Sequence, residues 1–112
     1  MGISTHILDI ACGRPARDVP VSLAQQNGPE WRTLNADKTD ADGRCRQLLP
    51  TDVRLEMGWY RVRFETAVYY EAQRLPGLYP YVEIVFEVRD TEQHYHIPLL
   101  LTPNGYTTYR GS

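Results

Sequence analysis

Two segments of the chain alternate between apolar and charged residues, and this pattern is what most constrains the fold. The segments are GWYRVRFET (58–66) and YVEIVFEVR (81–89), in which apolar residues return at nearly every second position. Successive side chains of a β-strand point to opposite faces, so such alternation indicates strands with one buried face and one exposed face. We therefore expect β-strands to form the body of the protein.

Further short segments rich in strand-forming residues are separated by Gly, Pro, Asn and Asp, which favour turns. We expect these additional strands at residues 3–10, 19–26, 30–39, 44–49, 94–101 and 106–112. Residues 65–75 are the helical candidate, which Pro76 and Gly77 should end sharply. Seven to eight short strands with one brief helix predict an all-β sandwich of two sheets.

Length and charge exclude several classes of protein. With 112 residues, the chain is expected to form a single domain over residues 1–112, with one modest core. The net charge of −2 provides no basic surface for nucleic acid, and no segment has the length of a membrane-spanning helix. The start, MGISTHILDI, lacks the basic and apolar regions of a secretory signal, so we expect a cytoplasmic protein. For Cys12 and Cys45, this favours free buried thiols over a disulfide.

Two features indicate an assembly of several copies. The segments YVEIVFEV and YTTYR are rich in strand-forming residues, and an open sheet edge of this kind is normally covered or paired. The chain also contains eight tyrosines, a residue that suits partly wet interfaces. The alternative is that these tyrosines cover an exposed sheet face.

The three histidines are His6, His94 and His96, and each falls in an expected strand. His94 and His96 are two positions apart, so their rings should project from the same face. A single histidine in a strand is more often structural than functional. Here, however, the first and seventh expected strands could bring all three together.

Two chemistries could use these histidines. A His-x-His pair with a third His could bind a catalytic zinc ion, although neither an acidic residue nor a Cys stands near the pair as a further ligand. The alternative is hydrolysis without a metal, in which one imidazole is the general base and a cation stabilises the oxyanion. Arg44 directly follows the tight turn DADG, so its charge could clamp a planar carbonyl compound and keep a nearby His neutral. An exposed Arg44 in a weak surface ion pair is the structural alternative.

The end of the chain, YTTYRGS, leaves two alternatives open. The last residues could fray in solvent, as chain ends commonly do. Alternatively, the Ser112 hydroxyl and the terminal carboxylate could enter a site, with Arg110 as a counter-charge.

Four segments together resemble the 5-hydroxyisourate hydrolases of the transthyretin-like family. They are STHILDIACGRPA, TDADGRC, HYHIPLLLTP and the terminal YTTYRGS, which occur in the family's order over nearly the whole chain. The terminal YRGS is the most specific, because it separates the hydrolases from the hormone-carrying transthyretins. Ile10 and Cys12 depart from the residues usual after LD in this family, away from the expected site.

The resemblance implies the activity and the residues that carry it. The family opens the six-membered ring of 5-hydroxyisourate by hydrolysis, giving 2-oxo-4-hydroxy-4-carboxy-5-ureidoimidazoline in urate degradation, and it uses no metal or organic cofactor. Its fold is a two-sheet sandwich, and it assembles as a homotetramer, a dimer of dimers, with sites at the dimer–dimer interface. The matching catalytic residues are His6, Arg44, His96 and Ser112, with Tyr109 also lining the site; His6 and Arg44 would bind substrate as well.

The expected mechanism uses one histidine as base and the other as acid. His6 or His96 deprotonates the attacking water, Arg44 holds the ring and its developing charge, and the other imidazole protonates the departing nitrogen. Ser112 and Tyr109 would position the ring and the water. The role of His94 stays open. A transthyretin-like protein that binds a small ligand without catalysis is the alternative.

Overall fold

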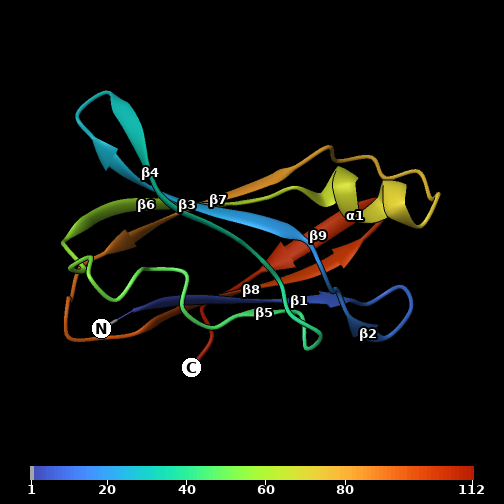
Figure 1. The fold of residues 1–112 in the computed structure, drawn as a ribbon, viewed down its shortest axis with the longest axis horizontal. Coiled ribbons are helices and arrows are strands. Elements are labelled where there is room, and N and C mark those ends of the chain that lie inside the picture. Colours follow the sequence, from blue (N-terminus) through green and yellow to red (C-terminus); the bar gives the residue numbers. More distant parts are fainter. Residues whose placement is uncertain (1) are drawn as a thin grey trace.

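The computed structural model describes residues 2–112 and shows two β-sheets packed against each other, with a short helix at one end (Figure 1). The elements of this part of the chain are β1 (Ile3–Asp9), β2 (Arg14–Pro15), β3 (Pro20–Asn27), β4 (Glu30–Lys38), β5 (Arg44–Cys45), β6 (Gly58–Phe64), α1 (Thr66–Ala72), β7 (Val82–Val88), β8 (Tyr95–Thr102) and β9 (Gly105–Thr108).

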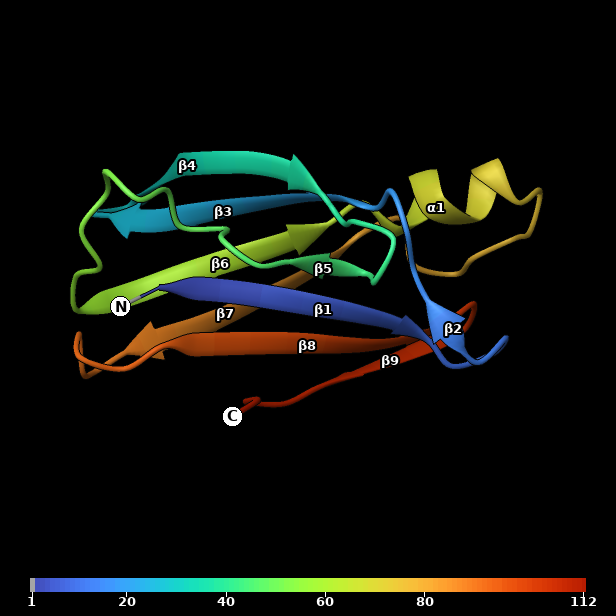
Figure 2. The same cartoon turned by 60° about the horizontal axis from the view of Figure 1, so that its bottom comes forward.

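The first sheet has the strand order β2-β1-β8-β9, with β5 also paired to β1. The second has the order β4-β3-β6-β7. Strands β1 and β8, from opposite ends of the chain, run parallel, and Figure 2 shows them side by side. This pairing sets Ser4 opposite His96 and His6 opposite Pro98. The register therefore brings two predicted site residues onto neighbouring strands.

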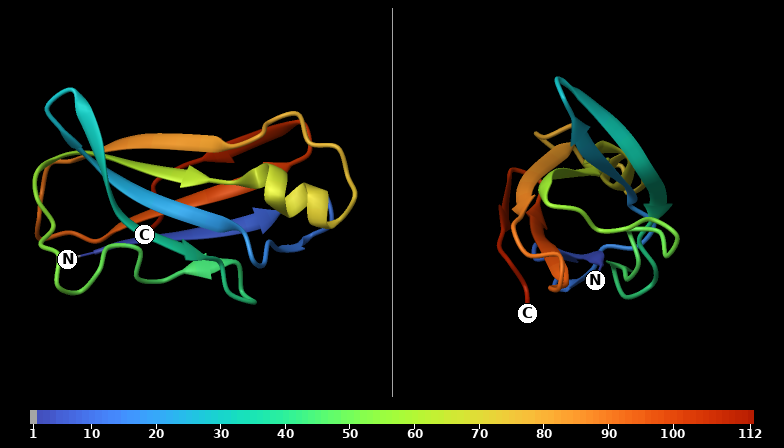
Figure 3. Two further views of the ribbon diagram at one scale, coloured as in Figure 1. Left: turned by 45° about the horizontal axis from the view of Figure 1, so that its top comes forward. Right: turned by 90° about the vertical axis from the view of Figure 1, so that its left-hand side faces the viewer.

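The core lies between the sheets, whose arrangement around it is visible end-on in Figure 3. In β1 the inward positions are Ile3, Thr5 and Ile7, all nearly inaccessible to solvent. The Thr5 hydroxyl donates a hydrogen bond of 2.6 Å to the carbonyl of Ile97, which satisfies this buried polar group. Because side chains alternate along a strand, Ser4 and His6 face away from the core. The apolar positions of β1 thus fix which residues it presents outward.

The predicted all-β sandwich of two sheets with one short helix is confirmed. The predicted strand 44–49 shortens to Arg44–Cys45, and the two-residue β2 was not expected, because pairings this short leave no alternation in the sequence. The helix ends at Ala72, before Pro76. Arg74 there adopts φ 57°, and the amide of Leu75 donates to the carbonyl of Tyr70. The chain thus ends the helix with a left-handed residue ahead of the proline.

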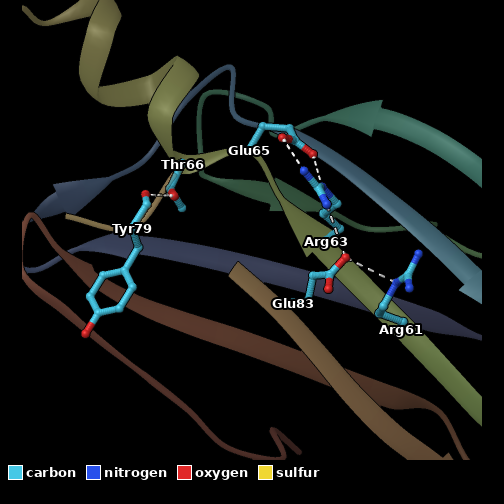
Figure 4. Close-up of polar contacts among 6 residues, drawn as sticks. All are labelled: Arg61, Arg63, Glu65, Thr66, Tyr79 and Glu83. Atoms are coloured by element: carbon cyan, nitrogen blue, oxygen red, sulfur yellow. Dashed lines mark hydrogen bonds and ion pairs between the residues drawn. The ribbon is translucent and has the colours of Figure 1, made fainter. Parts of the chain in front are cut away.

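A ladder of charges covers the outer face of the second sheet (Figure 4). Arg63 pairs with Glu65 at 2.6 Å and with Glu83 at 3.3 Å, and Arg61 reaches the same Glu83 carboxylate at 3.4 Å. Beside this ladder, the Thr66 hydroxyl donates to the carbonyl of Tyr79 at 2.8 Å. The charged side chains of this ladder are therefore paired with one another.

Both cysteines are free thiols, as expected. Cys45 is buried, but Cys12 is exposed, which corrects the expectation that both are buried. Cys12 lies in the turn after β1, where its amide donates to the Asp9 carboxylate at 3.3 Å. Among the residues that the structure describes, no helix has the length and apolar character needed to cross a membrane.

Candidate active site on the β1–β8 face

Pairing of β1 with β8 gathers two of the histidines and a serine on one outward face. Ser4 Oγ lies 2.8 Å from Nε2 of His94 and 2.8 Å from Nδ1 of His96. Both rings therefore project from the same face, as their spacing predicted. His94 is exposed and precedes β8, whereas His96 is half-buried within it.

Arg44 reaches the same face through a tight turn. One carboxylate oxygen of Asp40 accepts hydrogen bonds from the amides of Asp42 and Arg44, each 2.9 Å long. Gly43 adopts φ 76°, and its carbonyl accepts a 2.7 Å bond from the amide of Ile7. The turn is thereby tied to β1, and the β1–β5 register sets Arg44 directly opposite His6. Residues opposite each other in an antiparallel pair share a face, so these two side chains are neighbours.

The end of the chain returns to His96. β9 stops at Thr108, short of the predicted strand end, but the chain pairs once more where the Gly111 amide donates to the His96 carbonyl at 2.9 Å. Tyr109 and Arg110 interrupt the ladder between these points. This single bridge brings Ser112 to the histidines.

A pocket of about 280 Å³ opens at this face. It is lined by Ser4, Thr5, Arg44, Arg46, His94, His96 and Ser112. The predicted residues Arg44, His96 and Ser112 therefore share one pocket. His6 is not among the lining residues but lies beside them through its pairing with Arg44.

Burial and positive charge keep both predicted catalytic histidines neutral. Burial lowers the pKa of His6 from its usual 6.5, and the Arg44 charge lowers it further. The pKa of His96 is lowered by burial first, then by the charges of Arg44, His6 and His94. A neutral imidazole retains the lone pair that a general base needs. The site therefore favours bases that work at neutral pH.

The two arginines of the pocket differ in their partners. Arg46 pairs with Asp42 at 3.1 Å and with Asp40 at 3.7 Å. Within residues 2–112, no ion pair to a carboxylate is found for Arg44. Its guanidinium charge is thus free to act on a bound molecule, and the surface ion pair considered as its structural alternative is absent from the described chain.

Tyr109 lies apart from this pocket. The residue is 53% exposed and borders a second depression of about 200 Å³, which Tyr95 and Arg110 also line. The Arg110 guanidinium lies 4.4 Å from the centre of the Tyr95 ring and donates a 2.6 Å bond to Gln93. Arg110 therefore contacts residues at the start of β8. The sequence had instead suggested Arg110 as a counter-charge for the end of the chain.

Ser4 and Arg46 line the pocket but were not identified from the sequence. Ser4 precedes His6 by two residues, so strand alternation places both on one face. Its contact with two histidines depends on the parallel pairing of β1 with β8, which no local pattern indicates. Within the described chain, no cluster of three or more His, Cys, Asp or Glu side chains is arranged to hold a metal ion.

The sequence matches known proteins over nearly its whole length. The model of the HIUase/Transthyretin family matches residues 3–111. A 5-hydroxyisourate hydrolase of Salmonella typhimurium is 44% identical over 110 residues, covering 98% of this chain and 80% of that protein.

Solved structures agree on the fold. The 5-hydroxyisourate hydrolase of Klebsiella pneumoniae superposes with a TM-score of 0.87 at 34% identity, covering all of both chains. Sea bream transthyretin, solved in complex with thyroxine, superposes with a TM-score of 0.91 at 30% identity, covering 99% of this chain and 95% of that one. An enzyme and a hormone-binding protein thus share the fold, and only site chemistry can separate them. The family model, the sequence identity and the two-sheet fold together show that this chain belongs to the HIUase/Transthyretin family.

Proposed function

We propose that this protein is a 5-hydroxyisourate hydrolase that opens the six-membered ring of its substrate without a metal or organic cofactor. The observation that carries the proposal is the unpaired Arg44 guanidinium in the same pocket as His96 and Ser112. A free cation beside a neutral base supplies what hydrolysis of an amide-type bond needs. The relatives named 5-hydroxyisourate hydrolase supply the substrate.

In the mechanism, one imidazole takes a proton from water as the water attacks the carbonyl carbon. Arg44 holds the carbonyl oxygen as negative charge develops on it, and its planar guanidinium matches the planar ring. The second imidazole protonates the departing ring nitrogen and regains its proton from solvent. His6 and His96 fill these two roles, and the Ser112 hydroxyl positions the ring or the water.

The catalytic unit we propose is a cytoplasmic homotetramer, a dimer of dimers with the pockets at the dimer–dimer interface. Two observations support an assembly. The pocket lies on an outer sheet face, where a second copy would enclose it, and β7 carries exposed apolar side chains such as Val85 beside exposed Trp59. Because Tyr109 borders a different depression, its predicted contact with substrate would have to come from a neighbouring copy.

A carrier of a small ligand is the rival function, and the close superposition on sea bream transthyretin favours it. A carrier, however, has no need for two imidazoles of lowered pKa beside an unpaired guanidinium. The chemistry of the pocket therefore favours the hydrolase.

The test is to generate 5-hydroxyisourate from urate and to follow its ultraviolet decay with and without the protein. We expect acceleration that a chelator leaves unchanged, and a rate proportional to protein concentration. Loss of the acceleration on chelation would indicate a zinc hydrolase, and decay at the spontaneous rate together with ligand binding would indicate a carrier.

The site residues are tested by three variants. His96→Ala, Arg44→Ala and deletion of Ser112 should each reduce turnover, and full rates in all three would overturn the assignment of the site.

A further inference from the structure

The Ser4 hydroxyl lies between two imidazoles, at 2.8 Å from a nitrogen of each. Both distances are those of good hydrogen bonds. A serine hydroxyl has one proton to donate, so when both rings are neutral it donates to one and accepts from the other. The three groups therefore form a directed chain of hydrogen bonds that can point either way.

The direction of this chain decides the chemistry of His96. When Ser4 donates to Nδ1 of His96, the ring carries its proton on Nε2 and can act as an acid there. When His96 donates from Nδ1 to Ser4, the hydroxyl donates to Nε2 of His94, and Nε2 of His96 has a free lone pair. Within the described chain Nε2 of His96 has no hydrogen-bond partner, so it is the nitrogen left for substrate or water.

The chain of bonds also leads from the pocket to solvent. His96 is half-buried, Ser4 is 8% exposed, and His94 is exposed. A Cβ at Gly2 would come within 3.4 Å of Nδ1 and Cε1 of His94, so the backbone at Gly2 flanks this ring. His94 also borders another depression, of about 420 Å³ on the side of Gly2, which is distinct from the one at Tyr109. Its ring thus stands between the pocket and a separate opening to water.

The hydrolysis leaves one proton to be removed. Water supplies two: one goes to the departing nitrogen, which becomes part of a weakly basic urea group, and the other is released when the new carboxylic acid ionises. Burial disfavours a lasting positive charge on His96, and so do the charges of Arg44 from β5, His6 from β1 and His94 ahead of β8. No carboxylate side chain of the described residues lines the pocket to accept that proton.

We propose that Ser4 and His94 form a proton relay that keeps His96 uncharged when it takes a proton from water. A proton taken from water enters at Nε2 of His96 while the Nδ1 proton passes to Ser4. The Ser4 proton then passes to Nε2 of His94, which releases its Nδ1 proton to solvent. His96 is then neutral with its proton on Nε2, and it becomes a base again when that proton leaves to water and the chain takes a proton back through His94. Ser4 and His94 act through His96 and are positioning residues. The relay rests on the proposed hydrolysis.

Steady-state kinetics in dilute and concentrated buffer test the relay. In dilute buffer, Ser4→Ala and His94→Ala should lower kcat at least tenfold and change KM less than twofold. Added imidazole should restore most of the kcat of His94→Ala, because a small base can replace the exposed ring. Ser4→Thr keeps the hydroxyl and should retain activity. Thr102→Val, which removes a hydroxyl at the far end of β8, is the matched control.

Nitrogen NMR of the histidines provides a readout independent of turnover. In the free protein, Ser4→Ala should shift the tautomer populations of both His94 and His96, whereas Thr102→Val should leave them unchanged. An inactive wild-type protein would overturn the proposed function. An active wild-type protein with full kcat in Ser4→Ala and His94→Ala in dilute buffer, or with unchanged tautomers in Ser4→Ala, would overturn the relay alone.

Discussion

Gly111 lies directly against the ring of His96, and there is no room for a side chain between them. A Cβ built at Gly111 would overlap Cδ2 of His96, and it would lie 3.2 Å from Cγ of the same ring. The backbone bond from Gly111 to the His96 carbonyl holds the two segments at this separation. The glycine of the terminal YRGS thus has a steric function at the proposed catalytic base.

Gly111→Ala should therefore displace the His96 ring and lower kcat. Misplacement of a reacting group by about 1 Å costs roughly 100-fold in rate, so we expect a loss of about 10- to 100-fold. Gly105→Ala is the matched control, because a Cβ there meets only Thr102 Oγ1 at 3.6 Å. Equal kcat values for the two variants would show that the close approach is unimportant.

Removal of the Arg44 charge should change both the rate and its pH dependence. Loss of a group that stabilises an oxyanion costs about 100- to 1000-fold in kcat, which we expect for Arg44→Gln. Arg44 also lowers the pKa of His6 and of His96. The wild-type protein should therefore lose activity only as the pH falls below about 6.5, when the bases become protonated.

In Arg44→Gln the pKa of both His6 and His96 should rise, so this acid limb should move to higher pH. Rates of 5-hydroxyisourate decay measured between about pH 5 and 8 will show the shift. Arg89→Gln, which removes an exposed arginine paired with Glu87, should leave the profile unchanged. An acid limb at the same pH in both variants would contradict the electrostatic role of Arg44.

Gly43→Ala should destabilise the turn that presents Arg44. The residue has φ 76°, and a Cβ would overlap the carbonyl oxygen of Ile7 and lie 3.1 Å from Cβ of Pro15. A left-handed conformation alone costs a residue with a side chain about 1–2 kcal/mol, and the overlap adds to this cost. Gly28→Ala is the control, because Gly28 has φ 64° with nothing within 4 Å of its Cβ position.

Urea unfolding at one protein concentration will compare the two glycine variants. We expect a larger loss in the free energy of unfolding for Gly43→Ala than for Gly28→Ala. Equal losses would mean that the approach of the turn to β1 carries no steric constraint.

The two thiols should react very differently with a disulfide reagent. Cys12 is exposed, whereas Cys45 is buried and its pKa is raised to about 12 by burial and by the carboxylates of Asp37 and Asp40. Only the thiolate is reactive, so the native protein should titrate one thiol per chain and the denatured protein two. Cys12→Ser should abolish the native reaction, and a remaining fast reaction would show that Cys45 is accessible.

The sequence predicted the class of fold from local patterns, and three of its candidate site residues, Arg44, His96 and Ser112, line one pocket. Alternation in β6 and β7 predicted half-exposed strands, and the turn chemistry of DADG predicted that Arg44 would be displayed on a rigid support. The short strands and the helix end were harder to predict. β5 is held by pairing with β1, and the helix ends at Ala72, two residues before Arg74 adopts a backbone conformation that is rare for arginine.

What the sequence determined by itself was the set of reactive groups, since residue type and strand alternation decide which side chains face outward. Only the tertiary structure decided how these groups meet, because pairing between β1 and β8 joins residues about ninety positions apart. That register puts the Ser4 hydroxyl between His94 and His96. The pairing of the chain end with β8 separates Tyr109, which shares the terminal motif, from the pocket that Ser112 lines. These placements are set by hydrogen bonds between distant strands, which leave no local sequence pattern.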